Sequence, residues 1–71
     1  MKKHSVELSG HRTSIAIEDE FWNELKKIAH QKNTSLRQLL IQIDNNRTNN
    51  LASTIRVFVL KHHINQNEQS Q

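Results

Sequence analysis

Cysteine and proline are both missing from this 71-residue sequence, and glycine occurs only once. Without cysteine, the chain can form neither a disulfide nor a thiolate metal site. The scarcity of proline and glycine argues against a loop-rich or fibrous protein. A monomer of this length buries only about 60% of the surface that its unfolded chain exposes. Self-association is therefore the remaining way to stabilise so small a domain.

Long apolar runs are also missing. No apolar segment approaches the roughly 18 residues that are needed to cross a bilayer. The basic start, residues 1–4, is not followed by the apolar stretch of a signal peptide. We therefore expect a soluble, cytoplasmic protein that has no membrane partner.

Groups of residues that could carry out chemistry are equally scarce. His62 and His63 are adjacent rather than one helical turn apart, and no third ligand follows at metal spacing. The sequence gives no basis for a Ser-His-Asp triad or a catalytic pair of carboxylates. A single small domain also offers little concavity for a substrate. We therefore expect no enzymatic activity, no metal and no cofactor.

What the sequence does contain is a modest excess of positive charge. Ten Lys and Arg against seven Asp and Glu give a net charge of +3 and a pI of about 9.7. This excess permits a nucleic-acid partner without requiring one.

The most distinctive segment is residues 11–17, which have the alternating pattern of a β-strand. Successive side chains point to opposite faces, one carrying Thr13, Ile15 and Ile17 and the other carrying Arg12, Ser14 and Ala16. Every later segment has a helical or polar pattern, so this strand has no obvious partner. An isolated strand leaves its backbone N–H and C=O groups unpaired and is not stable alone. We therefore predict that a second copy of the chain supplies the partner strand.

Residues 1–10 are polar and end in Ser9-Gly10, which is typical of a turn or hinge. Val6 and Leu8 alternate with polar residues, so a short strand folded back as a hairpin on residues 11–17 is the alternative. We favour a flexible basic arm, which places the folded domain at residues 11–64.

Two helices are predicted after the strand. The first, residues 18–32, begins with acidic residues that suit the helix dipole and carries an apolar stripe. Asn33 is suited to the left-handed conformation that ends a helix. The second begins at Thr34 or Ser35, because Ser35 and Gln38 fit a capping box, and it ends within residues 44–46.

A third helix is predicted over residues 51–64, followed by a polar tail at residues 65–71. The apolar run at residues 55–60 is also compatible with a buried strand. We favour the helix because two apolar stripes keep helical spacing, namely Leu51, Ile55, Phe58 and His62, and Val57, Leu60 and Ile64. Two apolar faces imply burial on two sides, one of them against a partner subunit.

The order of these elements resembles the ribbon-helix-helix family of Arc- and MetJ-like DNA-binding domains. The likeness is closest to a subgroup of short domains that carry three sequence pieces in a fixed order. Here these pieces are Gly10-His11-Arg12-Thr13-Ser14, Glu20-Phe21-Trp22 and the segment from Asn50 to Val59. The match covers roughly residues 5–63.

The resemblance implies a mainly helical, intertwined homodimer in which two copies of residues 11–17 pair as an antiparallel two-stranded ribbon. The family reads double-stranded DNA with such a ribbon in the major groove. Base reading then falls to Arg12, Ser14 and Ala16, of which Ala16 can only touch a thymine methyl. Contacts with the DNA backbone are expected from Lys2, Lys3, His11, Thr34, Ser35 and Leu36. The dimer core is expected to contain Ile15, Ile17, Phe21, Trp22, Leu25, Leu39, Ile55 and Phe58.

These roles have simpler structural alternatives. Arg12 could be a solvated charge on an exposed strand, and Thr34 and Ser35 could be ordinary helix caps. We expect a sequence-specific DNA-binding protein, most simply a transcriptional repressor. The alternative is a protein-interaction module, for instance an antitoxin with a toxin partner that also binds its own promoter. A monomer with a hairpin at its N-terminus is the third reading, and a solution mass of 8.3 kDa would identify it.

Overall fold

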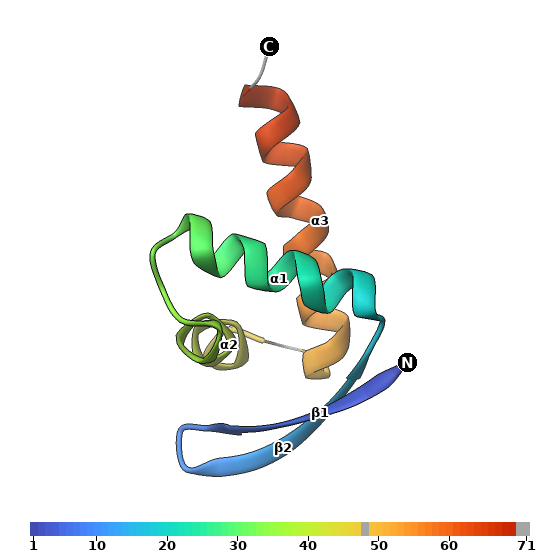
Figure 1. The fold of residues 1–71 in the computed structure, drawn as a ribbon, viewed down its shortest axis with the longest axis vertical. Coiled ribbons are helices and arrows are strands. Elements are labelled where there is room, and N and C mark those ends of the chain that lie inside the picture. The colour runs from blue at the N-terminus through green and yellow to red at the C-terminus, as the bar shows by residue number, and fades with distance from the viewer. Residues whose placement is uncertain (48, 70–71) are drawn as a thin grey trace.

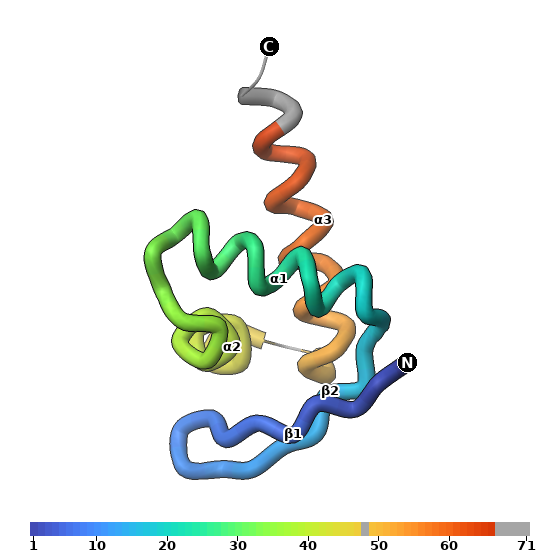
Figure 2. The backbone as a smooth tube through the Cα atoms, viewed as in Figure 1, coloured from blue at the N-terminus to red at the C-terminus, as the bar shows by residue number. Residues whose placement is uncertain are grey.

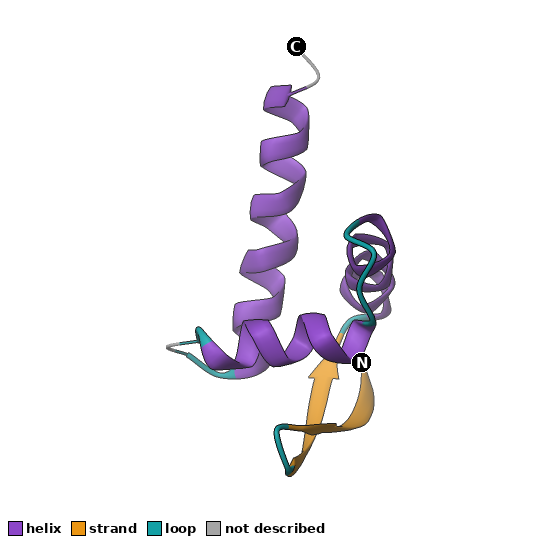
Figure 3. Cartoon of the chain, turned by 90° about the vertical axis from the view of Figure 1, so that its left-hand side faces the viewer, coloured by secondary structure: helices purple, strands orange, loops and turns teal. Residues whose placement is uncertain are grey.

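The structure is a computed structural model that describes residues 1–47 and 49–69, with side chains up to residue 66. Its elements, in order, are β1 (Lys2–Leu8), β2 (His11–Ile17), α1 (Asp19–Gln31), α2 (Leu36–Asn45) and α3 (Leu51–Gln69). The two strands lie along one end of the helical layer, and the C-terminal half of α3 extends beyond the other helices (Figure 1). A view turned by 90° shows the strands together on one side of the helices (Figure 3).

The strands form an antiparallel hairpin closed by the two-residue turn Ser9-Gly10. Both turn residues have positive φ, 52° for Ser9 and 84° for Gly10, as a type I′ turn requires. This turn type matches the twist of the flanking strands. The register pairs Leu8 with His11 at the turn and Lys2 with Ile17 at the open end. Figure 2 traces the reversal, with the two blue segments running side by side.

The hairpin corrects our expectations for the N-terminal part of the chain. We expected a flexible arm at residues 1–10 and only one strand, at residues 11–17, with its partner in a second subunit. Instead, β1 pairs with β2 within one chain, which is the alternative that the alternation of Val6 and Leu8 left open. A two-stranded ribbon therefore forms within one chain, so the folded domain begins at Lys2, and pairing of β2 with a second copy stays a prediction.

The physical reason is that β1 buries more than its sequence suggests. Leu8 is only 2% exposed, and Val6 packs against the same core. His4 stacks on Trp22, with ring centroids 3.9 Å apart and an interplanar angle of 8°. A two-residue turn also closes the hairpin at little entropic cost, because the loop is short.

The predicted helices are confirmed, with small shifts at their ends. Ser35 caps α2, and its hydroxyl oxygen accepts a hydrogen bond from the backbone N–H of Gln38 at 3.0 Å. Asn33 has φ 55°, the left-handed conformation expected of it. The segment at residues 55–60 is helical, and α3 continues to Gln69, past the predicted end at residue 64. Of the predicted polar tail, residues 70–71 lie outside the described residues.

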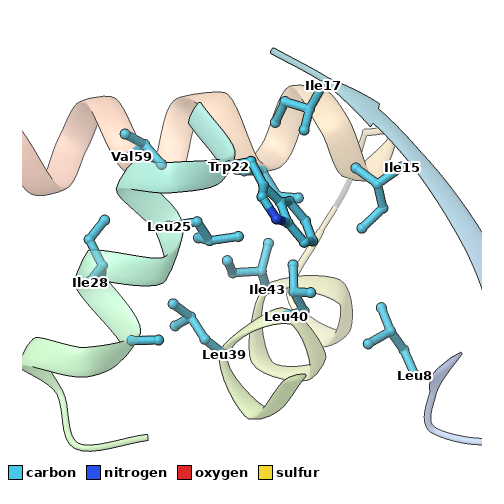
Figure 4. Close-up of a cluster of buried hydrophobic side chains, with 12 residues drawn as sticks. Leu8, Ile15, Ile17, Trp22, Leu25, Ile28, Leu39, Leu40, Ile43 and Val59 are labelled. Atoms are coloured by element: carbon cyan, nitrogen blue, oxygen red, sulfur yellow. The ribbon is translucent and has the colours of Figure 1, made fainter. Parts of the chain in front are cut away.

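The core lies between the hairpin and the helices (Figure 4). Side chains from all five elements are buried in it: Leu8, Ile15, Ile17, Trp22, Leu25, Ile28, Ala29, Leu39, Leu40, Ile43, Ile55 and Val59. Six of the eight residues expected in a dimer core are thus buried within a single chain, and the other two, Phe21 and Phe58, are half-buried. The expected fold class, mainly helical with a ribbon and three helices, is confirmed. None of the described helices is long and apolar enough to span a membrane.

Candidate nucleic-acid interface

The outer face of the hairpin points away from the helices and carries mostly polar side chains. The register fixes which of them are neighbours, because residues paired across an antiparallel ladder project to the same face. The cross-strand pairs on this face are Lys3 with Ala16, Ser5 with Ser14, and Glu7 with Arg12. All of these residues are exposed except Ala16, which is half-buried. The three predicted base-reading residues, Arg12, Ser14 and Ala16, therefore share one face.

A hydrogen bond from α2 shows which way the backbone N–H and C=O groups of the hairpin point. The Nε of Arg37 donates to the backbone oxygen of Glu7 at 3.2 Å, so this oxygen points away from β2. In an antiparallel ladder, opposite residues share this orientation and successive residues alternate. The backbone groups of Arg12, Ser14 and Ala16 therefore point away from β1, toward the open edge of β2.

A groove with a volume of about 520 Å³ runs along this edge. One wall is formed by residues 11–16 of β2, and the other by the end of α2 and the start of α3 with the loop between them. Arg47 in that loop pairs with Asp44 (Nε to Oδ1, 2.6 Å) and donates to the backbone oxygen of Asn49 at 3.0 Å. Arg47 thus links the end of α2 to Asn49 beside the groove.

The residues predicted to contact the DNA backbone are only partly brought together. Lys3 lies on the outer face, whereas Lys2 and His11 are in register with the inner face, opposite Ile17 and Leu8, although both are exposed. Thr34, Ser35 and Leu36 lie at the N-terminus of α2, where the hydroxyl of Ser35 acts as the cap. The Arg37 bond to β1 holds this helix end beside the hairpin.

Three residues at this surface did not enter the predicted site. Ser5 and Glu7 lie on the outer face of β1, and Arg37 links β1 to α2. The alternation of Val6 and Leu8 with polar residues was the signal that could have found Ser5 and Glu7. The contact of Arg37 with Glu7 joins residues 30 apart in sequence, and no local pattern indicates it.

Two acidic side chains, Glu18 just before α1 and Glu24 within it, are paired with basic residues of the helices. Arg56 donates hydrogen bonds to Glu18, and these lower the pKa of its carboxyl group below the ordinary value. A hydrogen bond with Lys27, and to a smaller extent one with His63, lowers the pKa of the Glu24 carboxyl group. The corresponding distances to Glu24 are 3.1 Å from Lys27 Nζ and 2.6 Å from His63 Nε2. No group of three metal-ligating side chains is found in the described part of the chain.

Comparison with curated proteins and with solved structures finds no match. The sequence model of the ribbon-helix-helix domain, in contrast, matches residues 1–63, which include both strands, α1, α2 and most of α3. Because this match covers most of the chain and agrees with the observed ribbon followed by helices, the chain belongs to the ribbon-helix-helix domain family, a family of DNA-binding regulatory proteins.

Proposed function

We propose that this protein binds double-stranded DNA sequence-specifically, with the outer face of its ribbon in the major groove, and acts as a transcriptional repressor. The observation that carries the proposal is the grouping of Arg12, Ser14 and Ala16 on an exposed face that points away from the core. The major groove admits a two-stranded ribbon, and the two central copies of β2 in the dimer proposed below would form such a ribbon.

Each of the three residues suits a different feature of a base edge. Arg12 can donate two hydrogen bonds to O6 and N7 of guanine, a contact that discriminates between bases by about 1–3 kcal/mol. Ser14 can donate or accept a hydrogen bond, and Ala16 can pack against the methyl group of thymine. Together they favour a short site that contains both a G·C and an A·T pair.

Phosphate contacts are proposed to position the ribbon without reading sequence. The N-terminus of α2 (Thr34, Ser35 and Leu36) offers backbone N–H groups and the positive end of the helix dipole to a phosphate. One cap cannot use all four free N–H groups at a helix start, so capping by Ser35 is compatible with this role. Lys2, Lys3 and His11 are proposed to contribute further contacts to the DNA backbone.

We also propose that the protein is a homodimer that forms through the open edge of β2. The backbone groups of Arg12, Ser14 and Ala16 point toward that edge, so an antiparallel pair centred on Ser14 would use all of them. The result is a four-stranded sheet with the two copies of β2 at its centre. An open edge of seven residues beside a groove of about 520 Å³ supports this arrangement. Phe21 and Phe58, which are half-buried in one chain, are the predicted dimer-core residues with apolar surface still to cover.

Selection of bound duplexes from random DNA, run at a stated salt concentration, tests the proposal. The wild-type protein should enrich one motif with two related half-sites, as a symmetric dimer requires. Enrichment of no motif, with binding that depends only on salt, would contradict sequence-specific recognition.

A second candidate function, a protein-interaction module such as an antitoxin, is favoured by one observation. Val57, Leu60 and Ile64 on α3 are large apolar side chains that are 49%, 57% and 46% exposed. Exposed apolar side chains at helical spacing are typical of a surface that binds a partner. A toxin-like reading frame beside the gene, whose purified product binds the wild type but not a Leu60→Lys variant, would favour this function over repression alone.

A further inference from the structure

Glu7 is the one carboxylate on the outer face of the hairpin, and it lies directly opposite Arg12. The pair is one step from the Ser9-Gly10 turn, which fixes its register. The outward orientation of the Glu7 backbone oxygen assigns this pair to the class without ladder hydrogen bonds between its members. In that class the side chains are closest, with Cα atoms about 4.5 Å apart.

Both charged groups are exposed at this position. Within the described residues, no ion pair of 4.0 Å or less joins Glu7 to Arg12 or engages either side chain elsewhere. The backbone oxygen of Glu7 accepts the hydrogen bond from Arg37 that ties β1 to the start of α2. Glu7 and Arg12 therefore occupy facing positions on the proposed DNA-facing surface, and the backbone that carries Glu7 is held in place.

The two groups have opposite hydrogen-bonding capacities. The guanidinium of Arg12 only donates, and the ionised carboxylate of Glu7 only accepts. The major-groove edge of a G·C pair offers the matching set, because guanine presents acceptors at N7 and O6 and cytosine presents a donor at N4. No other base pair presents two acceptors beside one donor in that order.

We propose that Glu7 is a specificity-determining residue that accepts a hydrogen bond from the N4 amino group of cytosine, while Arg12 donates to its paired guanine. The inference rests on the proposed DNA-binding function and extends the reading surface from β2 to β1. Glu7 also faces the polyanion with a negative charge. It therefore lowers the affinity for duplexes that offer it no cytosine amino group, because an uncompensated carboxylate near phosphates is repelled.

Two variants separate the hydrogen bond from the charge. Glu7→Val removes both the acceptor and the charge and suits an exposed strand. Glu7→Gln removes the charge but keeps an acceptor oxygen. Glu20→Gln is the matched control, because Glu20 is also an exposed carboxylate but lies on α1. Circular dichroism establishes that each variant is folded before its binding is measured.

The probe is the duplex selected by the wild-type protein, compared with the same duplex in which the cytosine is replaced by 2-pyrimidinone. This base lacks the N4 amino group and leaves the opposing guanine in place. We expect the wild type and Glu20→Gln to bind the replaced duplex about tenfold more weakly, the lower part of the range for one base contact. Glu7→Val should bind the two duplexes equally, and Glu7→Gln should keep part of the difference. Both Glu7 variants should bind unrelated DNA more tightly than the wild type does.

Failure of this inference can be distinguished from failure of the proposed function. If the wild type selects a motif but Glu7→Val keeps the full preference for cytosine over 2-pyrimidinone, Glu7 does not read the base and the inference is overturned. The same holds if Glu7→Val only raises affinity for all duplexes equally. If the wild type selects no motif, both the inference and sequence-specific binding are overturned.

Discussion

Arg56 on α3 donates two hydrogen bonds to the carboxylate of Glu18, the residue that joins β2 to α1. The Nε donates to Oε1 at 2.9 Å and an Nη donates to Oε2 at 3.2 Å, between residues 38 apart in sequence. This two-pronged geometry suits a guanidinium and a carboxylate. It links the junction between the ribbon and the helices to the third helix.

We expect the Arg56 contact to make the stability of the protein depend on pH. Because the hydrogen bonds lower the pKa of Glu18 below its ordinary value of 4.5, the ionised form is favoured in the folded state. The resulting stability is present above about pH 4.5 and is lost as the pH falls through the lowered pKa. We expect the free energy of unfolding in urea to fall less between about pH 6 and about pH 3 in Glu18→Gln than in the wild type. Glu20→Gln should keep the wild-type slope; equal slopes for all three proteins would contradict the prediction.

Leu25 tests the position of the hydrophobic core. It is fully buried between the helices and the hairpin. We expect Leu25→Ala to lower the free energy of unfolding by about 2–5 kcal/mol, because it removes apolar contacts and leaves a cavity. Lys26→Ala, at the exposed neighbouring position, is the control and should change the stability by less than about 0.5 kcal/mol. Similar values for the two variants in urea unfolding would contradict the observed core.

The Ser9-Gly10 turn offers a test with opposite signs at neighbouring positions. A Cβ at Gly10 would meet nothing within 4 Å, so Gly10→Ala has only the conformational cost of φ 84°. That cost is about 1–2 kcal/mol for an L-residue in the left-handed region. Ser9→Asn should instead stabilise the hairpin by a few tenths of a kcal/mol, since Asn-Gly is the preferred type I′ pair. Thermal unfolding should order the midpoints as Ser9→Asn, wild type, Gly10→Ala, and any other order would contradict the turn assignment.

Proline substitutions on the two strands test the proposed dimer edge. Because backbone groups alternate in direction along the antiparallel pair, the N–H of Ser14 points to the open edge of β2 and that of Ser5 to the outer edge of β1. Proline at either position removes no hydrogen bond between β1 and β2. We expect Ser14→Pro to have the monomer mass of 8.3 kDa by light scattering, whereas Ser5→Pro keeps the dimer mass of the wild type. A Ser14→Pro protein that is folded and still dimeric would exclude the β2 edge as the interface.

The helices and the faces of β2 could be predicted because their signals are local. Ser35 marks the start of α2 and Asn33 marks the end of α1, each within one helical turn. Ile15 and Ile17 alternate with more polar residues along β2. The strand at Lys2–Leu8 was less clear, since only Val6 and Leu8 are apolar and the stacking of His4 on Trp22 depends on the tertiary fold.

The end of α3 and the full extent of the candidate site were also beyond local patterns. After Ile64 the sequence has no apolar stripe, so periodicity could not indicate that the helix continues to Gln69. The grouping of Arg12, Ser14 and Ala16 followed from alternation, but the cross-strand position of Glu7 required the register of the hairpin. The roles of these residues in DNA binding remain predictions.

The most direct test of the central claim is the affinity of Arg12→Ala for the selected duplex, measured at one fixed salt concentration beside Lys26→Ala. Both variants lose one positive charge from an exposed position, but only Arg12 lies on the outer face of the ribbon. The account predicts that Arg12→Ala binds the selected duplex about 5- to 150-fold more weakly, with a relaxed preference for guanine at one position in each half-site. Lys26→Ala should bind like the wild type. Equal affinity of the two variants for the selected duplex would contradict the claim that the outer face of the ribbon reads DNA.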